Sequence, residues 1–176
     1  GIYCLEEGEQ KDTRVQLMGS GTILREVMAA AQLLKDDFNI NADVWSVTSV
    51  NELAREAKAC SRWNQLHPTK KARQSYLETQ LRGRKGPVIF ASDYIRAYAE
   101  QIREYIWSRF VSLGTDGFGR SDTRDNLRIF FEVNRYYVVV AALKALCDDG
   151  EIDSKVVQQA IRKYGIDPEK PNPITV

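Results

Sequence analysis

The feature that most constrains this chain is a regular alternation of strand-like runs with segments of helical periodicity. Runs rich in β-branched, aromatic and other apolar residues predict strands at 13–18, 43–48, 87–91 and 110–113. Apolar residues at helical spacing follow the first run over 23–38 and recur after each later run. Strands that alternate with helices in this way form parallel sheets. The sequence therefore predicts an α/β fold, a three-layer sandwich with a mainly parallel sheet and helices on both faces.

Turn and capping residues predict several element boundaries. Glycines flank Ser20 in a tight turn after the first strand, and Thr22 is placed to cap the helix that follows. Residues 60–71 are expected to be irregular, because Pro68 cannot continue a helix. Residues up to about 12 are polar and lack helical period, and 168–176 is expected to be an extended, proline-containing tail. The chain, residues 1–176, is expected to be a single domain.

Bulk composition excludes some classes of function. The 25 Lys and Arg residues balance 24 Asp and Glu residues, which gives no electrostatic argument for a nucleic acid or an acidic membrane surface. The three cysteines are far apart in sequence, so neither a zinc site nor a disulfide framework is suggested. No stretch approaches the roughly 20 apolar residues of a membrane span. A reducing, cytoplasmic setting is the expectation.

Two short motifs have both a functional and a structural interpretation. The turn around Ser20 lies where helix N-termini often bind phosphate, but it lacks the glycine spacing of a dinucleotide site and the lysine of a P-loop. His67 is the only histidine, too few for a multi-histidine metal site, and no serine or cysteine nucleophile motif accompanies it. A general-base role for His67 therefore stays open beside a structural or interface role.

The most distinctive segment is GTDGFGRSD at residues 114–122, which follows a predicted strand. In α/β folds, ligands bind where strands end. Its glycines would let the loop wrap a ligand or fit against another domain; alternatively, they only permit turns while Asp122 caps a helix. The residues alone predict an α/β domain without an evident acid-base or nucleophile constellation.

Several segments closely resemble the homodimeric, acetyl-transferring pyruvate dehydrogenases of bacteria. In chain order they are GSGTILRE at 19–26, DVWSVTS at 43–49, RWNQLHP at 62–68, LGTDGFGRSD at 113–122, and FEV at 131–133 with YVVVAAL at 137–143. The segment GTDGFGRSD is specific to this group, whereas the general transketolase pattern is looser. The resemblance is ordered and covers nearly the whole chain.

The resemblance implies both a fold and an activity. The chain would be the third of three α/β domains, of the transketolase carboxy-terminal type, with about five strands, one of them antiparallel. It would then be a fragment of a larger subunit. The full homodimeric enzyme is an oxidoreductase that uses thiamine diphosphate and magnesium. It decarboxylates pyruvate and reductively acetylates the lipoyl group of dihydrolipoyl acetyltransferase in a multienzyme complex.

The resemblance implies no catalytic, cofactor-binding or metal-binding residue in this chain. The family's cofactor lies between the first two domains of opposite subunits. Its diphosphate motif, Gly-Asp-Gly followed by two asparagines, is absent here, since Thr115 precedes Asp116-Gly117 and no Asn-Asn pair follows. The isolated chain is therefore expected to be inactive.

An interface role is the main hypothesis, with two alternatives. The expected partners are the other domains of the subunit, the second subunit of the homodimer and the acetyltransferase, with no nucleic acid and no membrane. The alternatives are a stand-alone regulatory module that binds a small anion at the Ser20 turn or the Asp116 loop, and a docking module for the acetyltransferase. The candidate interface residues are Arg62, Trp63, His67, Asp116, Phe118, Arg120 and Asp122.

Overall fold

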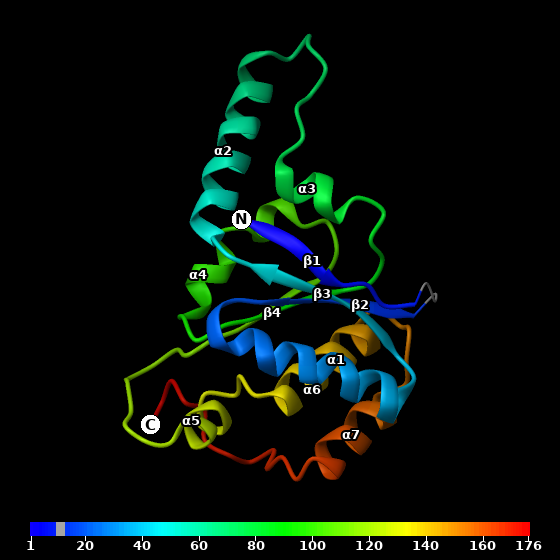
Figure 1. The fold of residues 1–176 in the computed structure, drawn as a ribbon, viewed down its shortest axis with the longest axis vertical. Coiled ribbons are helices and arrows are strands. Elements are labelled where there is room, and N and C mark those ends of the chain that lie inside the picture. Colours follow the sequence, from blue (N-terminus) through cyan, green and yellow to red (C-terminus); the bar gives the residue numbers. More distant parts are fainter. Residues whose placement is uncertain (10–12) are drawn as a thin grey trace.

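A computed structural model describes residues 1–9 and 13–176, whose strands form one five-stranded sheet (Figure 1). The strand order is β1-β3-β2-β4-β5. Strands β3, β2, β4 and β5 pair in parallel, whereas β1 pairs antiparallel with β3. The strands are β1 (Ile2–Glu6), β2 (Arg14–Gly19), β3 (Asn41–Val47), β4 (Val88–Ala91) and β5 (Phe110–Leu113). The predicted mainly parallel sheet is confirmed.

Helices cover both faces of this sheet, which makes the three layers that the alternation predicts (Figure 1). Helices α1, α6 and α7 share one apolar cluster with the sheet, and α2, α3 and α4 share the other. The helices are α1 (Leu24–Phe38), α2 (Val50–Leu66), α3 (Tyr76–Leu81), α4 (Arg96–Glu100), α5 (Arg124–Phe130), α6 (Arg135–Asp148) and α7 (Ser154–Lys163), with 3-10 turns η1 (Gly21–Ile23) and η2 (Arg103–Tyr105).

Neighbouring side chains of the buried strands point to opposite faces of the sheet. In β2, Leu17 packs in the cluster with α1 and α6, while Met18 packs in the cluster with α2 and α3. In β4, Ile89 and Phe90 divide in the same way. Strands that are buried on both faces show continuous apolar runs, and for this reason the PVIFA run predicted its strand well.

The edge strand β1 was not expected from the residues, which were described as polar to about residue 12. Residues 10–12 of that stretch lie outside the described part of the structure. Strand β1 runs antiparallel, as the resemblance implied, and only one of its sides is paired within the sheet. The hydroxyl of Tyr76 donates a hydrogen bond of 3.1 Å to the carbonyl of Ile2 in this strand.

Two boundary predictions were wrong. Thr22 does not cap α1, because the 3-10 turn η1 precedes the helix; its hydroxyl lies 3.4 Å from Asp93 Oδ2 instead. Residues 60–66 are helical rather than irregular, since α2 continues to Leu66. Proline restricts chiefly the residue before it, so Pro68 leaves the chain free to stay helical until that point.

The segment 168–176 contains turns and neither helix nor strand. Lys170 fixes its start, because Nζ donates to the carbonyl of Phe130 at 2.8 Å and pairs with Glu132 Oε1 at 3.0 Å. Further on, the carbonyl of Pro173 lies where a Cβ on Gly117 would be only 2.7 Å away. Gly117 also has a φ of +98°, a region that favours glycine. The segment therefore packs against the 114–122 loop.

The helices and the cysteines bear on membrane insertion and on disulfide formation. No helix of residues 1–9 and 13–176 combines the length and the apolar character that a bilayer crossing requires. Cys4, Cys60 and Cys147 are all free thiols. Burial raises the pKa of the Cys4 and Cys60 thiols above their ordinary value, which disfavours the reactive thiolate.

Candidate functional site

Three of the candidate interface residues lie on a projecting arm, which consists of the second half of α2 (residues 58–66) and the return loop 67–75 (Figure 1). The buried residues of α2 all lie in its first half, the last being Ala57. The second half therefore carries no residue of the domain core. Arg62 and His67 are exposed, and Trp63 is half-buried.

The arm is ordered by its own contacts. The His67 ring stacks on Trp63 with centroids 4.3 Å apart, and the Arg73 guanidinium lies 3.9 Å from the Trp63 ring centroid. The Asn64 amide donates to the carbonyl of Arg73 at 2.9 Å and accepts from its backbone N–H at 2.8 Å. Helix and return loop are thus held together without help from the sheet. A surface preformed in this way loses little conformational entropy when it binds a partner.

The other four candidates lie on the 114–122 loop, and two of them hold the loop in place. Asp116 Oδ1 accepts from the backbone N–H of Arg96 at 2.8 Å, and Oδ2 lies 3.2 Å from the Arg96 guanidinium. Asp122 accepts from the Asn126 side chain and the Thr123 backbone N–H, and these bonds lower the pKa of its carboxyl. Both carboxylates therefore serve local structure, at the starts of α4 and α5.

Phe118 and Arg120 are exposed and lie between these two carboxylates in the sequence. The Phe118 side chain is 80% exposed. Arg120 lies over the Phe130 ring, with its guanidinium carbon 4.7 Å from the centroid. Figure 1 places the loop beside α5, far from the arm and on the other side of the sheet. The structure thus separates the seven candidates into two surfaces.

A buried carboxylate network lies beside this loop and was missed from the sequence. Glu26 on α1 is 4% exposed. It accepts from the backbone N–H and guanidinium of Arg135 at 3.0 Å and from Arg128 at 3.1 Å. Burial alone would raise the pKa of Glu26, but these hydrogen bonds and charges outweigh burial and lower it. A signal existed, since Glu26 is four residues before the buried Ala30 and thus lies on the inner face.

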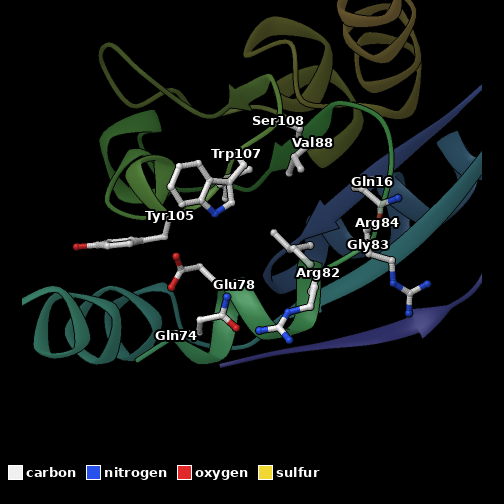
Figure 2. A pocket seen from close by; sticks show the side chains of 12 residues that line it. Gln16, Gln74, Glu78, Arg82, Gly83, Arg84, Val88, Tyr105, Trp107 and Ser108 are labelled. Atoms are coloured by element: carbon white, nitrogen blue, oxygen red, sulfur yellow. The ribbon is translucent and has the colours of Figure 1, made fainter. Parts of the chain in front are cut away.

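A second feature that was missed is a cavity of about 460 Å³ at the amino-terminal ends of the parallel strands, beside α3. Figure 2 shows the Trp107 indole on one side of it, with Glu78 and Arg82 on the other. Tyr105 and Val88 contribute buried apolar surface. Trp107 itself is 89% exposed. An aromatic residue outside any periodic segment, three residues before a strand, is the sequence signal that could have drawn attention to it.

The described residues do not fit a thiamine diphosphate–magnesium site. No group of three or more His, Cys, Asp or Glu residues within 1–9 and 13–176 could hold a metal ion. Asp116, the carboxylate nearest to the family's diphosphate motif in sequence, is engaged with Arg96. His67 stacks on Trp63, and its Nδ1 lies 2.8 Å from the Trp63 carbonyl.

Comparisons with known proteins agree with this fold. Residues 1–134 match the family described as transketolase-like TK C-terminal domain. The chain is 60% identical over 176 residues to the "Pyruvate dehydrogenase E1 component" of Pseudomonas aeruginosa, covering 99% of this chain and 20% of that protein. The proteins with the same name in Cupriavidus necator and Escherichia coli are 54% and 50% identical, over 100% and 98% of this chain and 20% and 19% of theirs. The chain thus spans about a fifth of the length of these relatives.

Solved structures show the same fold at lower sequence identity. A "split gene transketolase, inactive beta4 tetramer" superposes with a TM-score of 0.56 at 22% identity, covering 84% of this chain and 42% of that one. Transketolase from Leishmania mexicana gives a TM-score of 0.53 at 18% identity, covering 82% and 18%. These two likenesses bear on the fold alone. The family match and the sheet topology together show that the chain belongs to the transketolase-like TK C-terminal domain family.

Proposed function

We propose that residues 1–176 form the carboxy-terminal structural domain of a homodimeric pyruvate dehydrogenase. The observation that carries this proposal is the identity of 60% over almost every residue of the chain to a pyruvate dehydrogenase E1 component. The whole subunit would decarboxylate pyruvate and reductively acetylate the lipoyl group of dihydrolipoyl acetyltransferase. Three free cysteines support the cytoplasm as its compartment.

In this proposal the thiamine diphosphate and magnesium are held by the rest of the subunit. The fixed positions of Asp116 and Asp122 support this division, because both carboxylates already satisfy local hydrogen bonds. The domain would contribute stability and contact surface to the enzyme, and its own residues would not act on pyruvate.

The surfaces that support an interface role are the arm and the exposed part of the 114–122 loop. Exposed aromatic residues and arginines are enriched where proteins meet, and they contribute much of the binding energy there. Trp63 with Arg62 and His67 on the arm, and Phe118 with Arg120 on the loop, have this composition. Because the two surfaces lie far apart, we propose that they contact different parts of the dimer.

The activity part of the proposal is tested by comparing this chain with the longer subunit that contains it. Carbon dioxide release from pyruvate is measured with thiamine diphosphate and magnesium added, alongside calorimetric titration of the cofactor. We expect turnover and binding by the longer subunit and neither by the 176-residue chain. Turnover by the chain alone would overturn the assignment and would give His67 or the Asp116 loop a catalytic role.

The interface part is tested with Trp63→Ala, Phe118→Ala and Arg120→Ala in the longer subunit. Sedimentation velocity and pyruvate turnover are measured for each variant. Lys155→Ala, on the exposed side of α7, is the control. We expect weaker dimerisation or lower activity for variants of at least one surface and no change for the control. Normal dimerisation and activity in all three would reject the interface role.

Contact with the acetyltransferase is tested by titration with its peripheral subunit-binding domain. We expect the longer subunit to bind this probe and the 176-residue chain not to bind it. Binding by the chain, lost on substitution of the arm, would instead make this domain the docking module.

A further inference from the structure

A pocket of about 450 Å³ lies at the carboxyl ends of strands β2, β4 and β5. Residues just after these three strands, Thr22, Asp93 and Thr115, form one side of it. The loop residues Gly119 and Arg120 and the helix α5 form the other side. Segments that are about 20 to 70 residues apart in sequence therefore meet around one hollow, as the parallel arrangement of their strands requires.

The position of the pocket in the sheet is the one where α/β proteins bind ligands. Strands β2 and β4 are neighbours, but the chain leaves β2 toward β3 on one side and leaves β4 toward β5 on the other. The crossover connections therefore diverge between β2 and β4. In open α/β sheets this divergence opens a crevice outside the carboxyl ends of the strands.

The charged side chains that line the pocket are mainly cationic. Three arginines, Arg120, Arg124 and Arg128, face a single carboxylate, Asp93. Arg124 and Arg128 are four residues apart on α5 and so project from one side of that helix. A pocket with this excess of guanidinium groups attracts an anion.

The charges of Arg120 and Arg124 are not neutralised within the described residues. Arg128 forms an ion pair with Glu26 at 3.1 Å, and Glu26 forms a second ion pair with Arg135. For Arg120 the contact shown is the Phe130 ring, and across residues 1–9 and 13–176 neither Arg120 nor Arg124 has an ion pair. Asp93 has no ion-pair partner among the described residues either, and its carboxylate lies 3.4 Å from the Thr22 hydroxyl. Two guanidinium groups thus remain available to a ligand.

The floor of the pocket is apolar. Ile23, Phe131 and Val133 are buried, and Leu127 is half-buried. A bare inorganic ion would leave this surface without a partner, whereas an ion with a short carbon chain would cover it. We propose that this pocket binds a small organic anion, with an oxyanion head on Arg120 and Arg124 and a short apolar body against Ile23, Phe131 and Val133.

The proposal is tested by calorimetric titration of the 176-residue chain and of the longer subunit with three probes. Butyrate and propyl phosphate carry the two kinds of oxyanion head, and butyramide has the shape of butyrate without its charge. We expect saturable binding of at least one anion, with Kd of about 10 mM or below, and no binding of butyramide. Preference between the two anions assigns the head group as a carboxylate or a phosphate.

Matched variants separate a built site from general attraction to a basic protein. Arg120→Gln with Arg124→Gln should weaken the binding by about 10-fold or more, because charge-assisted bonds are lost. Lys70→Gln with Arg82→Gln removes the same charge elsewhere and should change nothing. If circular dichroism shows that the double variant is unfolded, Arg124→Gln alone replaces it, and we expect this single variant to bind the anion several-fold more weakly than the unchanged chain.

Three outcomes would overturn the proposal. They are no saturable binding of either anion, binding of butyramide as tight as that of butyrate, or a loss of affinity in the control variant equal to that in the Arg120 and Arg124 variant. The site does not depend on the proposed role in assembly. Sedimentation of the same longer-subunit variants therefore shows separately whether Arg120 and Arg124 act in ligand binding, in dimerisation or in both.

Discussion

Helices α1 and α6 extend along one face of the sheet for 15 and 14 residues, whereas α3 and α4 on the other face have 6 and 5. We call these the closed face and the open face. On the closed face, α7 adds a further cover, and the Glu26 network ties α1 to α5 and α6. On the open face, half of α2 leaves the sheet as the arm, and the Trp107 cavity remains. From this difference we expect the closed face to contribute more to the stability of the domain than the open face.

The largest expected effect tests this difference with two leucines that have no exposed surface. Leu143 lies in α6 on the closed face, and Leu77 lies in α3 on the open face. We expect Leu143→Ala to lower the free energy of unfolding by about 3 to 5 kcal/mol. Leu77→Ala should cost less, about 2 kcal/mol, because a short helix beside a cavity can collapse onto the space left behind. Urea denaturation measures both.

Equal costs for the two leucines would contradict the comparison of the faces. Hydrogen exchange adds a second measure. Leu77→Ala should accelerate exchange of the α3 amides without affecting α6, whereas Leu143→Ala should accelerate exchange throughout the sheet.

A smaller effect is expected from the carboxylate of the closed face. Glu26→Gln should lower the free energy of unfolding by about 2 to 3 kcal/mol, since it leaves Arg135 and Arg128 without their buried partner. Both guanidinium groups are partly exposed, and solvent reduces the cost. Glu52→Gln is the control, because this carboxylate pairs with Arg55 at the surface and should contribute about 0 to 1 kcal/mol.

The ion pairs of Glu26 also predict how the free energy of unfolding depends on pH. The pKa of Glu26 in the folded protein is lowered, so the stabilisation is complete above the ordinary glutamate value of about 4.3. It declines as the pH falls below that value and through the lowered pKa of the folded protein. The difference in stability between the protein and Glu26→Gln should therefore shrink on acidification. A difference that grows below pH of about 4 would contradict the direction of this shift.

The arm should respond locally rather than globally. Asn64→Ala removes both hydrogen bonds to the Arg73 backbone, and we expect a loss of about 1 kcal/mol or less in global stability. Proteolytic cleavage within 67–75 should become several-fold faster. Asn51→Ala, at the start of the same helix, is the matched control. A large global loss would show that the arm belongs to the cooperative core.

The smallest expected effect concerns Trp107. Because this side chain is 89% exposed, Trp107→Ala should change the free energy of unfolding by no more than about 0.5 kcal/mol. The Trp107 fluorescence of the longer subunit should nevertheless be blue-shifted relative to the 176-residue chain, if a partner covers the open face. Identical spectra would mean that this face stays in water.

The sequence predicted the closed face better than the open one, for a physical reason. Residues 23–38 and 136–147 are long helices whose apolar spacing is set by burial, and PVIFA is a strand buried on both sides. Strand β1 begins with a short apolar run, Ile2 to Leu5, which the polar residues after it obscured. Tyr3 and Leu5 are exposed at this edge strand, so burial does not give it the continuous buried pattern of β4. The second half of α2 has no residue in the domain core, so its sequence lacks the apolar periodicity that would have predicted where the helix ends. The network around Glu26 joins residues more than 100 positions apart, which local patterns do not report.

Tyr76 has a consequence for the behaviour of the protein at high concentration. An unpaired strand edge is a template on which another chain can extend the sheet. At β1 the Tyr76 hydroxyl already donates to the Ile2 carbonyl, so this acceptor is not free for an added strand. We therefore expect the side chain to oppose edge-to-edge pairing at β1, the antiparallel edge strand. Removal of a single phenol would expose that edge without disturbing the core.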